Sequence, residues 1–142
     1  KFINDSKATN IASALSSVES FGGSLAVIVG GKDKGVDYGE LARGLAQSQA
    51  RVYLIGEAAV PIGERLSALG YTNVEASGRL EAAVPAARAH LAASGGTVLL
   101  APACSSFDQF QSAEHRGQEF DRLVKELIAS EVGTTVQGGT NG

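Results

Sequence analysis

The sequence predicts an α/β domain: a doubly wound, mostly parallel sheet with helices on both faces. Three apolar, β-branched runs indicate buried strands at residues 24–31, 50–57 and 96–103. Continuous apolar runs of this length fit strands covered on both faces better than strands with one wet face. Helical patterns lie between them, and strands that alternate with helices imply right-handed crossovers and a Rossmann-like architecture.

The first two helices follow from a cap and from side-chain spacing. Residues 1–3 look like the end of a strand, and Asn10 then suits the N-cap of a helix over residues 9–21. In residues 37–47 two leucines stand one helical turn apart, which predicts the second helix.

Proline and glycine mark the next two helices. Pro61 near the start and Gly70 at the end delimit the third helix, and a weaker strand signal follows at residues 72–76. The fourth helical pattern, over residues 79–94, contains Pro85. This proline marks either a kink or the true start of the helix.

The last helix is predicted to be the longest, because apolar residues recur at three- and four-residue spacing. Its apolar face is expected to comprise Phe107, Phe110, Phe120, Leu123, Val124, Leu127 and Ile128. Ser105 or Ser106 would cap its start. The end of the chain is small and polar, so we expect a domain over residues 1–133 and a flexible tail over residues 134–142.

Composition limits the class of partner. The 142 residues are 44% hydrophobic and 19% charged, with a formal net charge of −3. This balance fits one globular domain and argues against nucleic acid or an anionic membrane surface as partner. No apolar run reaches the ~18–20 residues that span a bilayer. With one cysteine and no evident signal peptide, we expect a cytoplasmic protein, and we also expect a monomer. The first residue is not methionine, which suggests a segment of a longer chain.

Three loops are candidates for ligand binding, because ligands of doubly wound sheets lie beyond the carboxyl ends of the strands. They are "GGKDKG" at residues 30–35, the dipeptide at residues 56–57 and "PACSSFDQF" at residues 102–110. "GGKDKG" matches neither GxxxxGK[ST] nor GxGxxG. Its lysines either bind a carboxylate or phosphate, or belong to a solvated turn. "PACSSFDQF" either only caps the last helix or also presents free N–H groups to an anion.

The remaining chemistry-bearing side chains favour structural roles. Cys104 is expected to be a small buried hydrophobe. Glu114, Arg116 and Glu119 are expected to form an ordinary charged helix face. No group of His, Cys, Asp or Glu has the spacing of metal ligands, so we expect no metal ligand in this chain.

Three segments, taken together, resemble a known family. "INDSKATN", "GGKDKGVDY" and "LLAPACSSFDQFQSAEHRGQEF", in this order and spacing, resemble the C-terminal domain of the Mur ligases, most closely the D-glutamate-adding branch. The resemblance runs from residue 1 to about residue 133. Enzymes of this family have three domains: one for the UDP-sugar, a central one with a P-loop for ATP and magnesium, and the third one seen here. The resemblance therefore implies missing N-terminal and central domains.

The resemblance implies a reaction in peptidoglycan synthesis. ATP phosphorylates the carboxyl of UDP-N-acetylmuramoyl-L-alanine, and the amine of D-glutamate then attacks the acyl phosphate. ATP and magnesium would be held mainly by the central domain. The domain alone would therefore be inactive, and no residue of this chain is assigned a catalytic role.

The resemblance also assigns binding residues position by position. Thr9 and Lys34 match residues that hold the carboxylates of D-glutamate. Ser106 matches another carboxylate contact, and Phe107 lies beside it. Charge-assisted contacts of this kind are strong, and fixing the amine lowers the entropic part of the barrier.

On the nucleotide side, Asp5 matches a residue that binds the ribose of ATP, and Lys7 lies close to it. Two departures from the family pattern stand out. Ala113 replaces an aromatic residue whose backbone helps to hold the substrate, and Lys32 adds a second positive charge to the "GGKDKG" loop.

Two alternatives stay open at this point. One is the C-terminal domain of another Mur ligase or of a folylpolyglutamate synthetase. The other is a free-standing Rossmann-like module that binds a small anion or nucleotide. In the leading interpretation, ATP and D-glutamate meet between domains, so we expect hinge closure around residues 1–10.

Overall fold

The structure is a computed structural model that describes the backbone of residues 1–141 and the side chains of residues 1–132. Five strands form one sheet: β1 (Phe2–Asn4), β2 (Leu25–Gly30), β3 (Arg51–Ile55), β4 (Val74–Gly78) and β5 (Thr97–Leu100). Five helices flank it: α1 (Ile11–Glu19), α2 (Gly39–Ser48), α3 (Ala59–Ala68), α4 (Leu80–Leu91) and α5 (Ala113–Asn141). All strand pairs are parallel, in the order β1-β5-β2-β3-β4, which confirms the predicted fold class.

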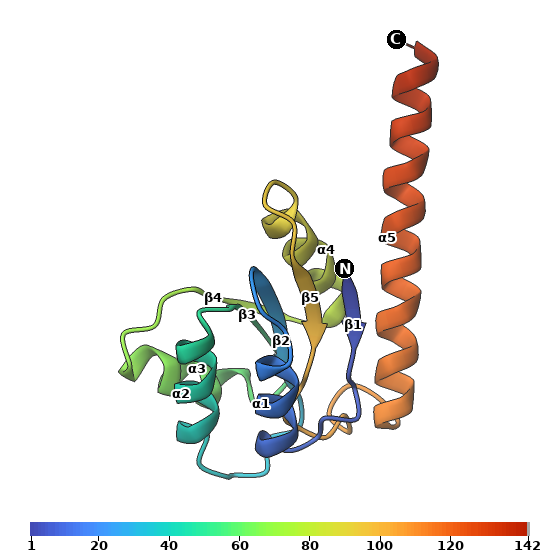
Figure 1. Cartoon of the computed structure of the whole chain (residues 1–142). Coiled ribbons are helices and arrows are strands. Elements are labelled where there is room, and N and C mark those ends of the chain that lie inside the picture. Colours follow the sequence, from blue (N-terminus) through green and yellow to red (C-terminus); the bar gives the residue numbers. More distant parts are fainter. Residues whose placement is uncertain (142) are drawn as a thin grey trace.

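The strand order explains why helices cover both faces (Figure 1). The crossovers from β1 to β4 all move in one direction, and right-handed connections then leave α1, α2 and α3 on the same face. The crossover from β4 to β5 runs backwards, so α4 lies on the other face with α5. Successive residues of β2 point to opposite faces: Val27 and Val29 pack with Leu41, whereas Ile28 packs with Leu80.

The predicted N-cap of the first helix and the predicted end of the third helix are confirmed. Asn10 caps α1, because its Oδ1 accepts the Ser13 N–H at 2.8 Å. Gly70 follows α3 with a φ of +74° and donates its N–H to the carbonyl of Ser67 at 2.9 Å, which is the expected helix stop. Pro85 lies inside α4, which begins at Leu80, so this proline does not start the helix.

The start of the last helix was predicted wrongly. The helix α5 begins at Ala113, and its cap is Ser112, whose Oγ accepts the His115 N–H at 2.9 Å. The preceding segment folds into turns, in which the Ser106 carbonyl accepts the N–H of Phe110 at 2.8 Å. Ser105 and Ser106 are therefore not caps.

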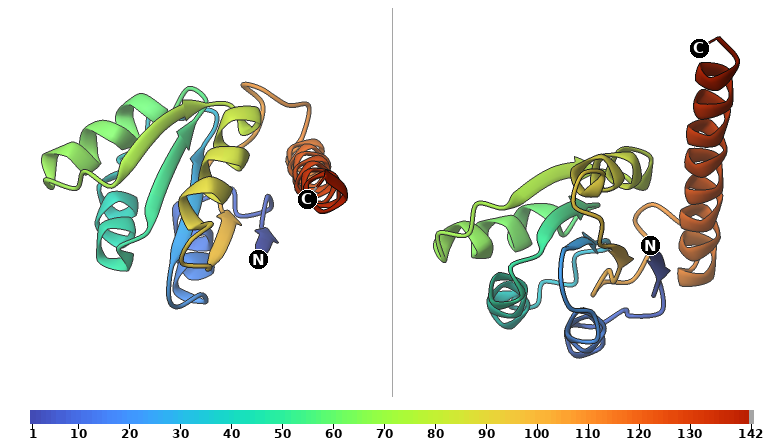
Figure 2. Two further views of the ribbon diagram at one scale, coloured as in Figure 1. Left: turned by 90° about the horizontal axis from the view of Figure 1, so that it is seen from above. Right: turned by 45° about the horizontal axis from the view of Figure 1, so that its top comes forward.

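The apolar face of α5 is otherwise close to the prediction. Phe120 is buried against α4, but Phe107 is 69% exposed and Ile128 is also exposed. Figure 2 shows α5 standing beside the edge strand β1 in two further views. Asn4 joins the two, because its Nδ2 donates to the Gly117 carbonyl at 2.9 Å. The tail predicted over residues 134–142 lies outside the residues whose side chains are described.

Candidate functional site

The residues singled out from the sequence gather at one edge of the sheet, the lower edge in Figure 1. All strands are parallel, so their carboxyl ends meet there. The loop after β1 carries Asp5, Lys7 and Thr9, the loop after β2 carries Lys34, and the loop after β5 carries Ser106 and Phe107. Because β5 lies between β1 and β2, the loop with Ser106 lies between the other two.

Backbone hydrogen bonds hold these three loops against each other. Ala103 N–H donates to the Ala8 carbonyl at 2.8 Å, and Lys32 N–H donates to the Ser105 carbonyl at 2.9 Å. Gly31 allows the second contact: its φ is +147°, and a β carbon there would collide with the Ser105 carbonyl oxygen. The loops after β1, β2 and β5 thus form one connected surface.

The loop after β3 joins the same surface through Asp108. The Asp108 carboxylate accepts the Glu57 N–H at 3.0 Å. Gly56 is needed beneath it, because a β carbon at this position would collide with that carboxylate. Gln109 extends the contact to the edge strand β4 by donating its Nε2 N–H to the Gly78 carbonyl at 2.9 Å. The dipeptide at residues 56–57 therefore shapes the site and supports the turn that follows Ser106.

The two lysines of the "GGKDKG" loop differ in their partners. Lys32 Nζ pairs with Glu57 Oε1 at 3.1 Å, so the additional charge noted in the sequence is neutralised locally. Lys34 is exposed, and none of the ion pairs among the described residues involves it. Asp33, between them, is turned into its own loop: its Oδ1 accepts from Gly35 N–H at 2.9 Å and from the Tyr38 hydroxyl at 3.1 Å. Lys34 is thus the cation of this loop that is available to an anionic ligand.

Ser106 has a buried hydroxyl that lacks a hydrogen-bond partner among the described residues. The residue is 1% exposed, and within the described part of the chain its Oγ has no hydrogen-bond partner. A buried hydroxyl without a partner costs about 1–3 kcal/mol. The neighbouring Cys104 is also buried, as predicted, and burial raises the pKa of its thiol to about 11. The thiol is therefore neutral near pH 7.

Arg116 contradicts the sequence prediction most clearly. It is not part of a charged helix face but completely buried, with an exposed fraction of 0%. Its Nε donates to Ser6 Oγ at 3.0 Å, its Nη2 to the Ser6 carbonyl at 2.7 Å and its Nη1 to the Cys104 carbonyl at 3.0 Å. A usable signal was present in the sequence: Arg116 precedes Phe120 by four residues and so falls on the apolar face.

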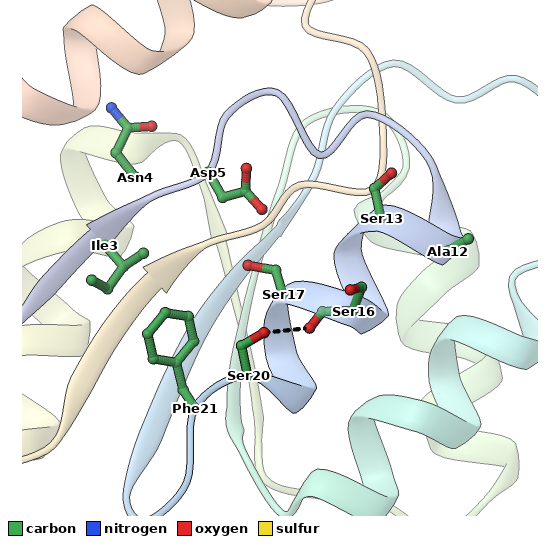
Figure 3. Close-up of a pocket in the computed structure, with 9 residues that line it drawn as sticks. All are labelled: Ile3, Asn4, Asp5, Ala12, Ser13, Ser16, Ser17, Ser20 and Phe21. Carbon is green, nitrogen blue, oxygen red and sulfur yellow. Dashed lines mark hydrogen bonds between the residues drawn. The ribbon is translucent and has the colours of Figure 1, made fainter.

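Asp5 and Lys7, in the loop after β1, line pockets. Figure 3 shows Asp5 pointing into a pocket of about 640 Å³ between β1 and α1, toward Ser17. The Asp5 side chain is half-buried, and its carboxylate accepts no hydrogen bond from the described residues. Asp5 and Lys7 also line a second pocket of about 430 Å³, between the loop after β1 and the start of α5. Thr9, Lys34 and Ser106 line neither pocket.

A half-buried carboxylate that accepts no hydrogen bond from the described residues can accept one from the hydroxyl groups of a ligand. Among residues 1–132, no three His, Cys, Asp or Glu side chains cluster as ligands of a metal ion. No helix in the described part of the chain is long and apolar enough to cross a membrane.

Comparison with known proteins identifies the family. Residues 1–104 match the family model described as "Mur ligase, glutamate ligase domain". The chain belongs to this family. Its fold and its position in the family agree with the resemblance seen in the sequence, including the D-glutamate-adding branch.

Three curated relatives of this Mur ligase domain are each named UDP-N-acetylmuramoylalanine–D-glutamate ligase. The protein of Solibacter usitatus is 48% identical over 126 residues, which cover 89% of this chain and 28% of that protein. The protein of Koribacter versatilis is 44% identical over 130 residues, which cover 92% and 28%. The protein of Acidobacterium capsulatum is 48% identical over 123 residues, which cover 87% and 26%. The chain thus spans about 28% of the length of the curated relatives it matches.

Proposed function

We propose that this chain is the D-glutamate-binding domain of an ATP-dependent ligase that adds D-glutamate to UDP-N-acetylmuramoyl-L-alanine in peptidoglycan synthesis. The names of the relatives support this proposal. The structural observation that carries it is the loop after β5, which lies between the loop with Thr9 and the loop with Lys34 and contains the Ser106 hydroxyl, a group without a hydrogen-bond partner among the described residues.

D-Glutamate brings two carboxylates and an amine to this edge. Lys34 offers a charge-assisted contact to one carboxylate, and the hydroxyls of Thr9 and Ser106 offer donors to the other. The Ser106 hydroxyl is covered in the free domain, so this contact requires the turn at residues 105–110 to shift. Fixing both carboxylates directs the amine at the carboxyl that it attacks.

The nucleotide lies on the other side of the loop after β1 in this proposal. Asp5 would accept a hydrogen bond from the ribose of ATP, and Lys7 would lie close to the phosphates. When bound, ATP supplies the phosphoryl group that activates the carboxyl of the sugar nucleotide. This chain orients the two reactants. The parts of the ligase that bind the sugar nucleotide, magnesium and most of ATP lie in other domains.

Ala113 has a restricted part in binding. The Ser6 hydroxyl donates to the Ala113 carbonyl at 2.6 Å. This bond uses one of the two lone pairs of the Ala113 carbonyl oxygen, and the Ala113 N–H, in the first turn of α5, has no acceptor within the helix, so either group can make the backbone contact expected from the family pattern. Since alanine has no ring, it adds no packing over the substrate.

A titration of the ¹⁵N-labelled chain with D-glutamate tests the proposal. We expect amide shifts to concentrate at Thr9, Lys34 and Ser106, with smaller shifts from equimolar L-glutamate. Shifts spread over the amino-terminal edge of the sheet, or equal shifts from both enantiomers, would overturn the assignment. Tight ATP binding by the isolated chain would favour a free-standing nucleotide module instead. The proposal also expects the isolated chain to be inactive as a ligase, monomeric and cytoplasmic.

A further inference from the structure

Arg116 is a buried cation whose partners are all neutral. Its guanidinium donates three hydrogen bonds, to the Ser6 hydroxyl, the Ser6 carbonyl and the Cys104 carbonyl, at 2.7–3.0 Å. The Asp108 carboxylate exerts a favourable electrostatic influence on Arg116, but among the described residues it forms no ion pair with it. Burial lowers the pKa of Arg116 to about 10, so it remains charged near pH 7.

The bonds of Arg116 join two loops that lie far apart in the sequence. Ser6 stands between Asp5 and Lys7 in the loop after β1. Cys104 stands two residues before Ser106 in the loop after β5. The planar guanidinium reaches both loops at once with fixed directions, which a lysine ammonium cannot do in the same way.

Stability alone does not explain a charge in this place. Removing a charge from water costs several kcal/mol, and replacing a buried ionic group by a well-packed apolar one is often neutral or stabilising. The neighbouring positions of the same helix face, such as Phe120, show that apolar side chains fill this layer. The requirement is therefore one of geometry between the two loops.

We infer that Arg116 is a positioning residue: it fixes the loop after β1, at Ser6 between the nucleotide-side residues Asp5 and Lys7, to the loop after β5, at Cys104, so that the two reactants are held in one alignment. Ser6 extends this link, because its hydroxyl accepts from Arg116 and donates to the Ala113 carbonyl. The first turn of α5 is thereby tied to the same point. The inference rests on the proposed function.

The test uses a complete ligase that carries this domain, with the variants Arg116→Lys and Ser6→Ala. Arg116→Lys keeps the positive charge but loses the planar guanidinium that donates to both loops at once, so we expect kcat with saturating substrates to fall about 10- to 100-fold. We expect the KM values for ATP and D-glutamate to rise together. Ser6→Ala removes one acceptor and keeps the Ser6 carbonyl, so its losses should be in the same direction and smaller. The KM for the sugar nucleotide should not change.

The matched control is Arg122→Lys, on the exposed side of the same helix, where Arg122 pairs with Glu119 and Glu126. It should leave every kinetic constant unchanged. Folded Arg116→Lys and Ser6→Ala proteins with normal kinetics would overturn the inference while the proposed function stands. A loss of activity that is explained entirely by a smaller fraction of active enzyme, as measured by active-site titration, would also overturn it. A wild-type enzyme that releases no ADP in response to D-glutamate would instead refute the proposed function.

Discussion

Replacing Ser106 by alanine should stabilise the free domain, although the residue lies at the centre of the proposed site. The Ser106 hydroxyl is buried and, within the described residues, has no hydrogen-bond partner. An unsatisfied buried hydroxyl destabilises a protein by about 1–3 kcal/mol, so its removal is stabilising. The small void left by the missing oxygen offsets part of this stabilisation. We therefore expect Ser106→Ala to raise the free energy of unfolding by about 1 kcal/mol, or the melting temperature by about 3 °C.

Urea unfolding of this chain, followed by far-UV circular dichroism, measures the change. The matched control is Ser112→Ala, which removes the cap of α5 and should lower the free energy of unfolding by about 1 kcal/mol. The changes in the free energy of unfolding should thus have opposite signs in the two serine variants. Equal destabilisation by both would refute the reasoning, because the Ser106 hydroxyl would then have a partner in the free domain. In a complete ligase, Ser106→Ala should nevertheless raise the KM for D-glutamate.

Two further predictions concern the loops around this serine. Gly31→Ala should lower the free energy of unfolding by about 3 kcal/mol or more, because φ is +147° and the new β carbon would collide with the Ser105 carbonyl. The control Gly35→Ala, at φ +69° in open space, should lower it by only about 1 kcal/mol. Similar losses in the two variants would contradict the geometry. Burial raises the pKa of the Cys104 thiol to about 11, above the ordinary value of 9. The unfolded thiol ionises first, so stability should fall between pH 9 and pH 11, more steeply in the wild type than in Cys104→Ala. Parallel pH profiles of the two proteins would count against the burial of a neutral thiol.

The fold could be predicted from the sequence because its strands are buried on both faces. Runs such as the one ending at Gly30 have no polar positions to mislead a periodicity argument. Local caps were equally readable, since Asn10 and Gly70 act through their own backbone neighbours. The loops at the carboxyl ends of the strands followed from topology alone.

The start of the last helix and the role of Arg116 could not be predicted from the local sequence. The turn around Ser106 is held by contacts with distant loops, such as the one between Asp108 and Glu57, which local propensity does not contain. The prediction treated Arg116 as solvated because charged residues are mostly exposed. Its partners, Ser6 and Cys104, come from segments 110 and 12 residues away, and only the folded chain brings them together.

The central claim is that D-glutamate binds at this edge of the sheet and that Lys34 is its cationic contact. The most direct test compares Lys34→Ala with Lys32→Ala in a complete ligase that carries this domain, by measuring the KM for D-glutamate. Lys32 is already paired with Glu57, so its loss should change that KM little. Loss of a charge-assisted contact at Lys34 should raise it by about 10-fold or more, with little change in the KM for the sugar nucleotide. Equal effects of the two substitutions, or a larger effect at Lys32, would contradict the account.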